Sequence, residues 1–227
     1  MARRASPTSA LSALALAGAL ALAVLASCAG SGYTYVQNTE AKVYFKLPED
    51  WELYREGDIL ADEVAEEDLE ALSEQVWLRG FDGAGSPAPE HVLASDAEEP
   101  RGLAEVRPIP PAERDSLSLA TLRQTGFGQD PTTGQPIDPV VYAQANPDGA
   151  IELLDYEELV LDSGARGVRL SARIEGESTV VFDRITMVDA ATERRYSFTV
   201  GCLAACWDEH EDVLAEIADS WTLEDSS

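Results

Sequence analysis

Apolar and polar residues alternate with a period of two through much of the last third of the chain, a pattern typical of strands with one buried face. Residues 156–161 and 168–174 flank the turn sequence Asp162-Ser163-Gly164, and together they predict a hairpin. Residues 179–188 are apolar on both faces, as expected of a central strand that is covered on both sides. The alternation returns at residues 196–202, so this region predicts an antiparallel meander.

The helices and the other strands are predicted by weaker patterns. A closing helix would place Val213, Leu214, Ile217 and Trp221 on one face. The segments 83–100 and 127–149 are rich in turn-forming residues and predict two long loops. Upstream of the meander we expect strands at residues 42–47, 76–82 and 103–107 and helices at residues 62–74 and 116–125. The combination predicts the α+β class, with an antiparallel meander flanked by helices.

The amino terminus has the layout of an export signal. Arg3 and Arg4 precede an apolar run from Ala10 to Leu25. That run would extend about 24 Å as a helix with a rise of about 1.5 Å per residue. This length falls short of a hydrocarbon core of roughly 30 Å, so a secretory signal is favoured over a membrane-spanning helix.

The signal ends in Leu25-Ala26-Ser27-Cys28, which resembles the lipobox of bacterial lipoproteins. The resemblance implies cleavage before Cys28, attachment of lipid to its thiol and a location at the outer face of the cell membrane. Two or more acyl chains anchor a protein firmly. We therefore divide the chain into a signal peptide at residues 1–27, a lipidated tether at residues 28–40, a single domain at residues 41–223 and a tail at residues 224–227.

The chain is strongly acidic, with 42 aspartates and glutamates against 16 lysines and arginines and a net charge of −26. Nucleic acids and anionic membrane surfaces would be repelled, so we expect neither as a docking partner. Solubility, adaptation to salt and a GC-rich genome each account for this acidity. A divalent cation bound by the acids of residues 49–70 is an alternative, although no calcium-loop motif is present.

Cys202 and Cys206 are the cysteines that remain once Cys28 carries lipid. An exported protein matures in an oxidising compartment, where an isolated pair of cysteines forms a disulfide by default. Their spacing allows the Cα separation of roughly 5.5–6 Å that a disulfide prefers. Zinc is the competing interpretation, and it lacks ligands because the nearest histidine, His210, stands among acids.

Arginines are concentrated in the predicted meander. Arg169 and Arg173 should share the outer face of their strand, where Arg184 or Arg195 can join them. Two interpretations stay open at this point. The guanidinium groups pair with the many acids nearby, or they form a patch that binds an anion or an acidic partner.

No motif in the sequence points to catalysis. Ser86 lacks the glycines that surround a hydrolase nucleophile, and His210 lacks the second histidine of a metalloprotease helix. A glycine-rich nucleotide-binding motif is missing as well. We therefore predict no catalytic residue, no cofactor and no metal ligand. An envelope hydrolase that uses two carboxylates remains the alternative, because the separation that would identify such a pair cannot be read from a sequence.

Four features, taken in order, resemble the PsbP-like family, which includes the LpqN-type lipoproteins of actinobacteria. They are Leu47-Pro48-x-x-Trp51 after the first strand, the late meander, the Cys202-x-x-x-Cys206 spacing and a terminal helix that ends in residues 218–223. The resemblance spans residues 41–223 and implies an α/β/α sandwich. It also implies a binding or assembly module with an unknown protein or small ligand as partner. The oligomeric state stays open.

Overall fold

The computed structural model describes residues 32–61, 63–94 and 98–224, so Cys28 and the expected signal peptide lie outside the described residues. Within these ranges, no helix has the length and apolar character needed to cross a membrane. The strands are β1 (Tyr33–Asn38), β2 (Val43–Pro48), β3 (Glu52–Arg55), β4 (Trp77–Asp82), β5 (Arg101–Pro108), β6 (Ile151–Val160), β7 (Arg166–Ile174), β8 (Val180–Val188), β9 (Arg194–Leu203) and β10 (Thr222–Leu223). The helices are α2 (Glu56–Ile59), α3 (Glu66–Ser73), η2 (Pro89–His91), α4 (Pro111–Arg114), α5 (Leu119–Arg123), α6 (Pro139–Ala145) and α7 (Ala204–Ser220).

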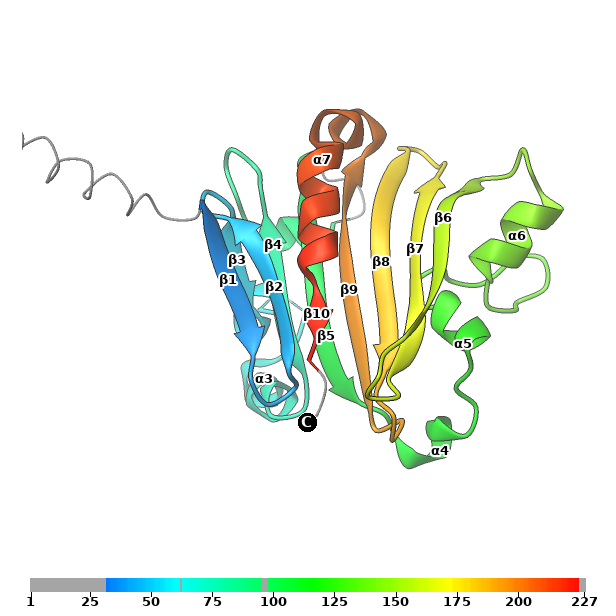
Figure 1. Cartoon of the computed structure of the whole chain (residues 1–227). Helices are drawn as coiled ribbons and strands as arrows, with labels where there is room; N and C mark the ends of the chain where they lie inside the picture. The colour runs from blue at the N-terminus through cyan, green and yellow to red at the C-terminus, as the bar shows by residue number, and fades with distance from the viewer. Residues whose placement is uncertain (1–31, 62, 95–97, 225–227) are drawn as a thin grey trace, which may run out of the picture.

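The strands form two antiparallel sheets (Figure 1). The smaller sheet has the order β1-β2-β10, and the larger sheet has the order β3-β4-β5-β9-β8-β7-β6. The chain builds one half of the larger sheet from β3 to β5 and then passes through α4, α5 and α6 to the far edge at β6. It returns through four consecutive strands until β9 pairs with β5. The predicted meander and the α+β class are confirmed.

The smaller sheet and α7 cover one face of the larger sheet, which we call the α7 face (Figure 1). Phe45 of β2 is fully buried there, and its ring centroid lies 5.8 Å from that of Phe81 on β4 and 5.2 Å from that of Phe198 on β9. Leu214 and Ile217 of α7 complete this core. Their spacing of three residues places both on the inner face of the helix, as the sequence pattern predicts.

The opposite face of the larger sheet, which we call the groove face, is covered in two zones, and the first zone, formed by α5 and the segment from Phe127 to α6, contains two hydrophobic clusters. Leu122 of α5 packs on Val168 and Val188 of β7 and β8. At the other end of the sheet, Val92 packs on Leu78 of β4. Residues of β5, β9 and β8 line an open hollow between these zones, and this hollow positions the site described below.

Strand β1 corrects the prediction of a tether that continues to residue 40. Tyr33–Asn38 pairs along its whole length with β2, and Val36 is buried. The hydroxyl of Tyr33 donates a hydrogen bond of 2.8 Å to Glu216 of α7. The domain therefore begins at β1, because this segment finds its partners on elements that are distant in the sequence.

The short elements differ most from the predictions. Strand β3 and helix α2 have no predicted counterpart, and α3 begins at Glu66 instead of residue 62. Helix α5 is shorter than expected, since Ser118 caps it and Arg123 ends it. The segment 127–149 contains α6, which begins with Asp138 as its N-cap and a proline in its first turn. Local capping signals, rather than apolar periodicity, define α5 and α6.

Candidate functional site

The arginines of the meander do not form one patch. Residues directly opposite each other in a sheet point to the same face. Arg169 is paired with Ile185 and Arg173 with Val181, which places both on the α7 face. Arg184 is paired with Leu170, and by the same rule it points to the groove face. Arg195 is paired with Val188 and is also on the groove face. Arg169 and Arg173 thus share a face as predicted, but the prediction that Arg184 or Arg195 joins them there is wrong.

The two arginines on the α7 face are paired with acids. Arg169 Nη2 lies 2.6 Å from a carboxylate oxygen of Asp183, and its Nη1 lies 2.6 Å from Asp219 of α7. Arg173 Nε lies 3.4 Å from Glu152 on the edge strand β6. Pairing with nearby acids is one of the two interpretations of these arginines, and it is correct for Arg169 and Arg173.

Arg184 has different surroundings. Its Nε donates to Thr199 Oγ1 at 3.0 Å, and its Nη1 donates to the carbonyl oxygen of Thr125 at 2.5 Å. The guanidinium carbon lies 4.8 Å from the ring centroid of Phe182 and 5.7 Å from that of Phe127. Within the described residues this arginine forms no ion pair with a carboxylate. The cation is held by neutral groups.

Burial lowers the pKa of the Arg184 guanidinium to about 10. The side chain is therefore still protonated at neutral pH, and it keeps a full positive charge in a partly desolvated position. Hydrogen bonds between a charged group and its partner are stronger than those between neutral groups. An anion that reaches this guanidinium would gain from both effects.

Gly126 allows the backbone to close over Arg184. It has a φ of +80°, and a Cβ atom at this position would collide with the guanidinium. Only glycine adopts such a conformation without strain and leaves the space that the guanidinium occupies. The loop after α5 thus fixes the position of the cation.

Arg184 lines a groove with a volume of about 630 Å³ on the groove face. This volume is typical of small-molecule sites. Its charged side chains are Arg101, Glu177 and Arg184, so the described lining carries a net charge of +1 in a chain whose net charge is −26. The other lining residues are Val92, Leu93, Ala94, Gly102, Leu103, Gly126, Ile174, Ser178, Val180, Phe182, Thr199 and Gly201.

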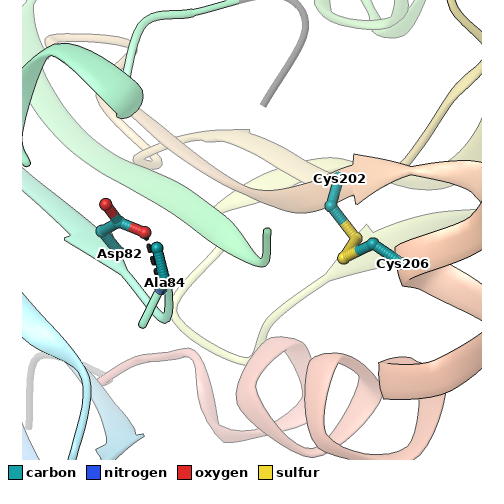
Figure 2. The surroundings of a disulfide bond; sticks show 4 residues. All are labelled: Asp82, Ala84, Cys202 and Cys206. Carbon is teal, nitrogen blue, oxygen red and sulfur yellow. Dashed lines mark hydrogen bonds between the residues drawn. A yellow bond between two sulfur atoms is a disulfide. The ribbon is translucent and has the colours of Figure 1, made fainter. Parts of the chain in front are cut away.

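Asp82 at the end of β4 holds the loop that forms one wall of the groove. Its buried carboxylate accepts hydrogen bonds from the backbone N–H groups of Ala84, at 2.9 Å, and Ala88, at 3.0 Å. The Nδ1 atom of His91 lies 2.8 Å from the same carboxylate. Figure 2 shows the contact with Ala84. These bonds fix the backbone just before Val92.

Arg195 lies outside the groove. It is paired with Arg107 across β5 and β9, and its Nε is buried without a hydrogen-bond partner among the described residues. Burial, followed by the like charge of Arg107, lowers the pKa of Arg195. This residue therefore does not extend the site around Arg184.

The predicted disulfide between Cys202 and Cys206 is present (Figure 2). It joins the end of β9 to the first turn of α7, with a Cα–Cα distance of 6.0 Å. Cys202 is fully buried, and Cys206 is nearly so. The bond belongs to the core under α7 and does not line the groove.

The acidic segment at residues 49–70 contributes to local structure. Asp58 accepts the backbone N–H of Arg55 at 3.0 Å, and Glu56 pairs with Arg79 on β4. In the part of the chain that the structure describes, no group of three or more metal-ligating side chains could hold an ion.

A second hollow, of about 530 Å³, lies between the turn after β1 and the end of α3. Glu40 and Glu74 both line it. Glu40 is largely exposed and pairs with Arg194 of β9 at 3.0 Å. This pair fastens the β1–β2 turn to the larger sheet.

No family model matches the chain, and no curated protein sequence does. Similar solved structures include cyanobacterial PsbP (CyanoP) from Synechocystis sp. PCC 6803, with 15% identity, 87% of this chain and 97% of that chain covered, and a TM-score of 0.48. Protein PA94 of unknown function from Pseudomonas aeruginosa has 12% identity, with coverage of 86% and 100% and a TM-score of 0.35. The Ran-binding protein Mog1p from Saccharomyces cerevisiae has 9% identity, with coverage of 85% and 96% and a TM-score of 0.38.

A PsbP structure is thus among the similar solved structures. These similarities concern the fold alone. All three TM-scores are below 0.5, and we base no argument about function on them.

Proposed function

We propose that this chain is an extracytoplasmic lipoprotein, anchored to the outer face of the cell membrane through Cys28, whose domain binds a small ligand without converting it. The lipobox-like sequence before Cys28 supports the anchor. The groove on the opposite side of the sheet from α7 is the proposed binding site.

One observation carries the proposal. Arg184 lines a groove of ligand size, and its guanidinium is fixed by Thr125 and Thr199 instead of a carboxylate. The chain has 42 acidic residues, yet none of the described ones forms an ion pair with this arginine. A buried cation that lacks a counter-charge is stabilised when an anionic group binds beside it.

Binding is favoured over hydrolysis by the composition of the groove. Glycoside hydrolysis requires two carboxyl groups that flank the scissile bond. The described lining residues contain one, on Glu177, and neither His91 nor His210 is among them. The hydroxyls of Ser178 and Thr199 have no histidine beside them in this lining, so a hydrolase nucleophile lacks its base.

The test uses site-specific photocrosslinking of the full chain in the cell that produces it. A photoreactive phenylalanine analogue replaces Leu93, which lies on the groove wall and is 48% exposed. The matched control carries the analogue at Val141 of α6, which is 57% exposed and outside the groove. We expect a small-molecule adduct, seen by mass spectrometry of the intact protein, at position 93 and not at position 141.

Two results would overturn the proposal. Equal labelling at both positions would show that the groove is not selective, and a protein adduct at position 93 would replace the small ligand with a protein partner. The anchor is tested separately by Cys28→Ser. This substitution should abolish lipid labelling and release the protein from the membrane fraction, and retention with full labelling would exclude Cys28 as the anchor.

A further inference from the structure

The polar and apolar groups of the groove are unevenly distributed among its walls. Arg184 and Thr199 meet on the floor, on the neighbouring strands β8 and β9. The loop after η2 contributes Val92 and Leu93, whereas the end of β7 contributes Ile174. A ligand that fills this space would meet a cation on the floor and aliphatic side chains on the walls.

We infer that the groove binds an apolar monocarboxylate, with its carboxylate on the guanidinium of Arg184 and its apolar body between Leu93 and Ile174. This inference rests on the proposed function and specifies the class of ligand. The occupant is a small molecule with one negative charge, not a protein surface or a membrane.

The charge of the ligand follows from the charge of Arg184. Its guanidinium carries one positive charge and forms no ion pair with a carboxylate of the described residues. A single carboxylate neutralises that charge, whereas a dianion would leave one negative charge uncompensated in a partly desolvated site. A cationic ligand would be repelled by Arg184.

The donors that remain on Arg184 also suit a carboxylate. Its Nε and Nη1 bond Thr199 and Thr125, and its Nη2 forms no hydrogen bond with a described residue. Nη2 is not among the buried atoms that lack a partner, so part of its surface is accessible, and Arg184 is one of the residues that line the groove. A planar guanidinium binds carboxylate oxygens with shorter and stronger hydrogen bonds than those between neutral groups.

The guanidinium is already ordered before a ligand binds. Phe182 and Phe127 contact it, and Gly126 closes over it. An ordered side chain does not lose rotamer freedom on binding, and this loss is one of the main entropic penalties of association. A weakly interacting carboxylate can therefore bind at this position.

The test is calorimetric titration of the lipid-anchored protein in nanodiscs, with empty nanodiscs as the blank. Four probes share either the head group or the chain of the inferred ligand: octanoate, octan-1-ol, octylammonium and acetate. We expect octanoate to bind at least about tenfold more tightly than octan-1-ol, because a hydrogen bond to a charged group is worth roughly that factor. Acetate and octylammonium should give no measurable binding.

Variants assign the effect to Arg184. Arg184→Gln should lose about tenfold or more in octanoate affinity and leave the affinity for octan-1-ol unchanged, and Arg184→Lys should retain part of the preference. Arg173→Gln removes the same charge from the α7 face and should bind octanoate like the wild type. The four-probe comparison on the wild type needs no variant, so it decides the matter even if Arg184→Gln does not fold.

Each outcome has a separate meaning. Equal affinity for octanoate and octan-1-ol would overturn the carboxylate while the groove remained a ligand site, so the proposed function would survive. Acetate binding as tightly as octanoate would overturn the apolar body and reduce the site to a bare anion site. The absence of any binding by the four probes would overturn the inference, and the photocrosslinking at position 93 would still test the proposed function independently.

Discussion

The guanidinium of Arg169 and the carboxylate of Asp183 meet on the α7 face at 2.6 Å, where Asp183 is only 5% exposed. Arg169 Nε also donates to both carboxylate oxygens of Asp183, at 3.2 and 3.1 Å. A third residue, Asp219 of α7, bonds Arg169 Nη1 at 2.6 Å. The pair therefore compensates a buried charge and fastens α7 to the sheet.

Replacing Arg169 with glutamine should destabilise the protein by about 3–5 kcal/mol, because it leaves the buried carboxylate of Asp183 without its counter-charge. The matched control is Arg173→Gln, which removes an arginine from the same strand and face. Its partner Glu152 is 62% exposed, so we expect a loss of less than about 1 kcal/mol. Urea unfolding of both variants measures the two losses, and equal values would contradict this account of the pair.

The same substitution should change the pH dependence of stability. Burial raises the pKa of Asp183 above its usual value of 3.8, and the hydrogen bond and charge of Arg169 oppose that rise. In Arg169→Gln the opposition is lost, so the pKa of Asp183 in the folded state rises further. An acid with a raised pKa in the folded state destabilises the fold when it is charged, and protonation relieves the penalty.

The difference in unfolding free energy between Arg169→Gln and the wild type should therefore shrink as the pH falls from 7 toward 4. Urea unfolding at pH 7, 6 and 5 measures this difference directly. Adding Asp183→Asn to the variant removes the titrating group, so the double variant should lose the part of the pH dependence that Asp183 causes. If the difference in unfolding free energy grew as the pH falls, the substitution would have lowered the pKa of Asp183 instead of raising it, and this prediction would be wrong.

The meander could be predicted because its pattern depends on burial alone. Val168, Leu170 and Ala172 alternate with half-buried positions, and all three are buried on the groove face. The spacing of Cys202 and Cys206 likewise limits the geometry on its own. Signals of this kind do not require knowledge of which strand lies next to which.

The sequence analysis names Arg184 as a candidate for binding an anion, but the groove around it could not be predicted, because the groove depends on the register of the strands. A shift of one residue would move Arg184 to the other face of the sheet, and the sequence contains no information on the pairing of Arg184 with Leu170. The groove also gathers residues from segments that are far apart, from Val92 to Gly201. Helix α6 is a different case. Asp138 followed by a proline is an N-cap signal, but the other prolines of the segment 127–149 lead to the prediction of a loop.

Replacing both Cys202 and Cys206 with alanine should lower the free energy of unfolding by about 2 kcal/mol. The disulfide closes a short loop, so it lowers the conformational entropy of the unfolded chain by only a small amount. Urea unfolding with and without reductant checks this value. Reductant should lower the free energy of unfolding of the wild type and leave that of the double variant unchanged. If the fully reduced wild type kept its free energy of unfolding, the disulfide would not stabilise the fold.

Replacing Asp82 with alanine should release the loop that forms the groove wall. The substitution leaves the backbone N–H groups of Ala84 and Ala88 without their acceptor, and we expect a loss of about 3 kcal/mol. Hydrogen exchange should speed up from residue 84 to Val92. Asp130→Ala is the control, because this carboxylate also caps a loop, at Thr132, and neither residue lines the groove. Unchanged exchange in Asp82→Ala would show that other contacts hold the wall.

Gly126→Ala and Gly128→Ala form a matched pair that tests the environment of Arg184. Both glycines have a positive φ, +80° and +71°, so both alanines meet backbone strain of about 1–2 kcal/mol. Only the Cβ at position 126 collides with the guanidinium, whereas position 128 faces open space. We therefore expect Gly126→Ala to lose more unfolding free energy and at least about tenfold in octanoate affinity, with Gly128→Ala binding like the wild type. Urea unfolding and calorimetric titration measure the two losses. Equal octanoate affinity in both variants would show that octanoate binding does not depend on the position of the Arg184 guanidinium.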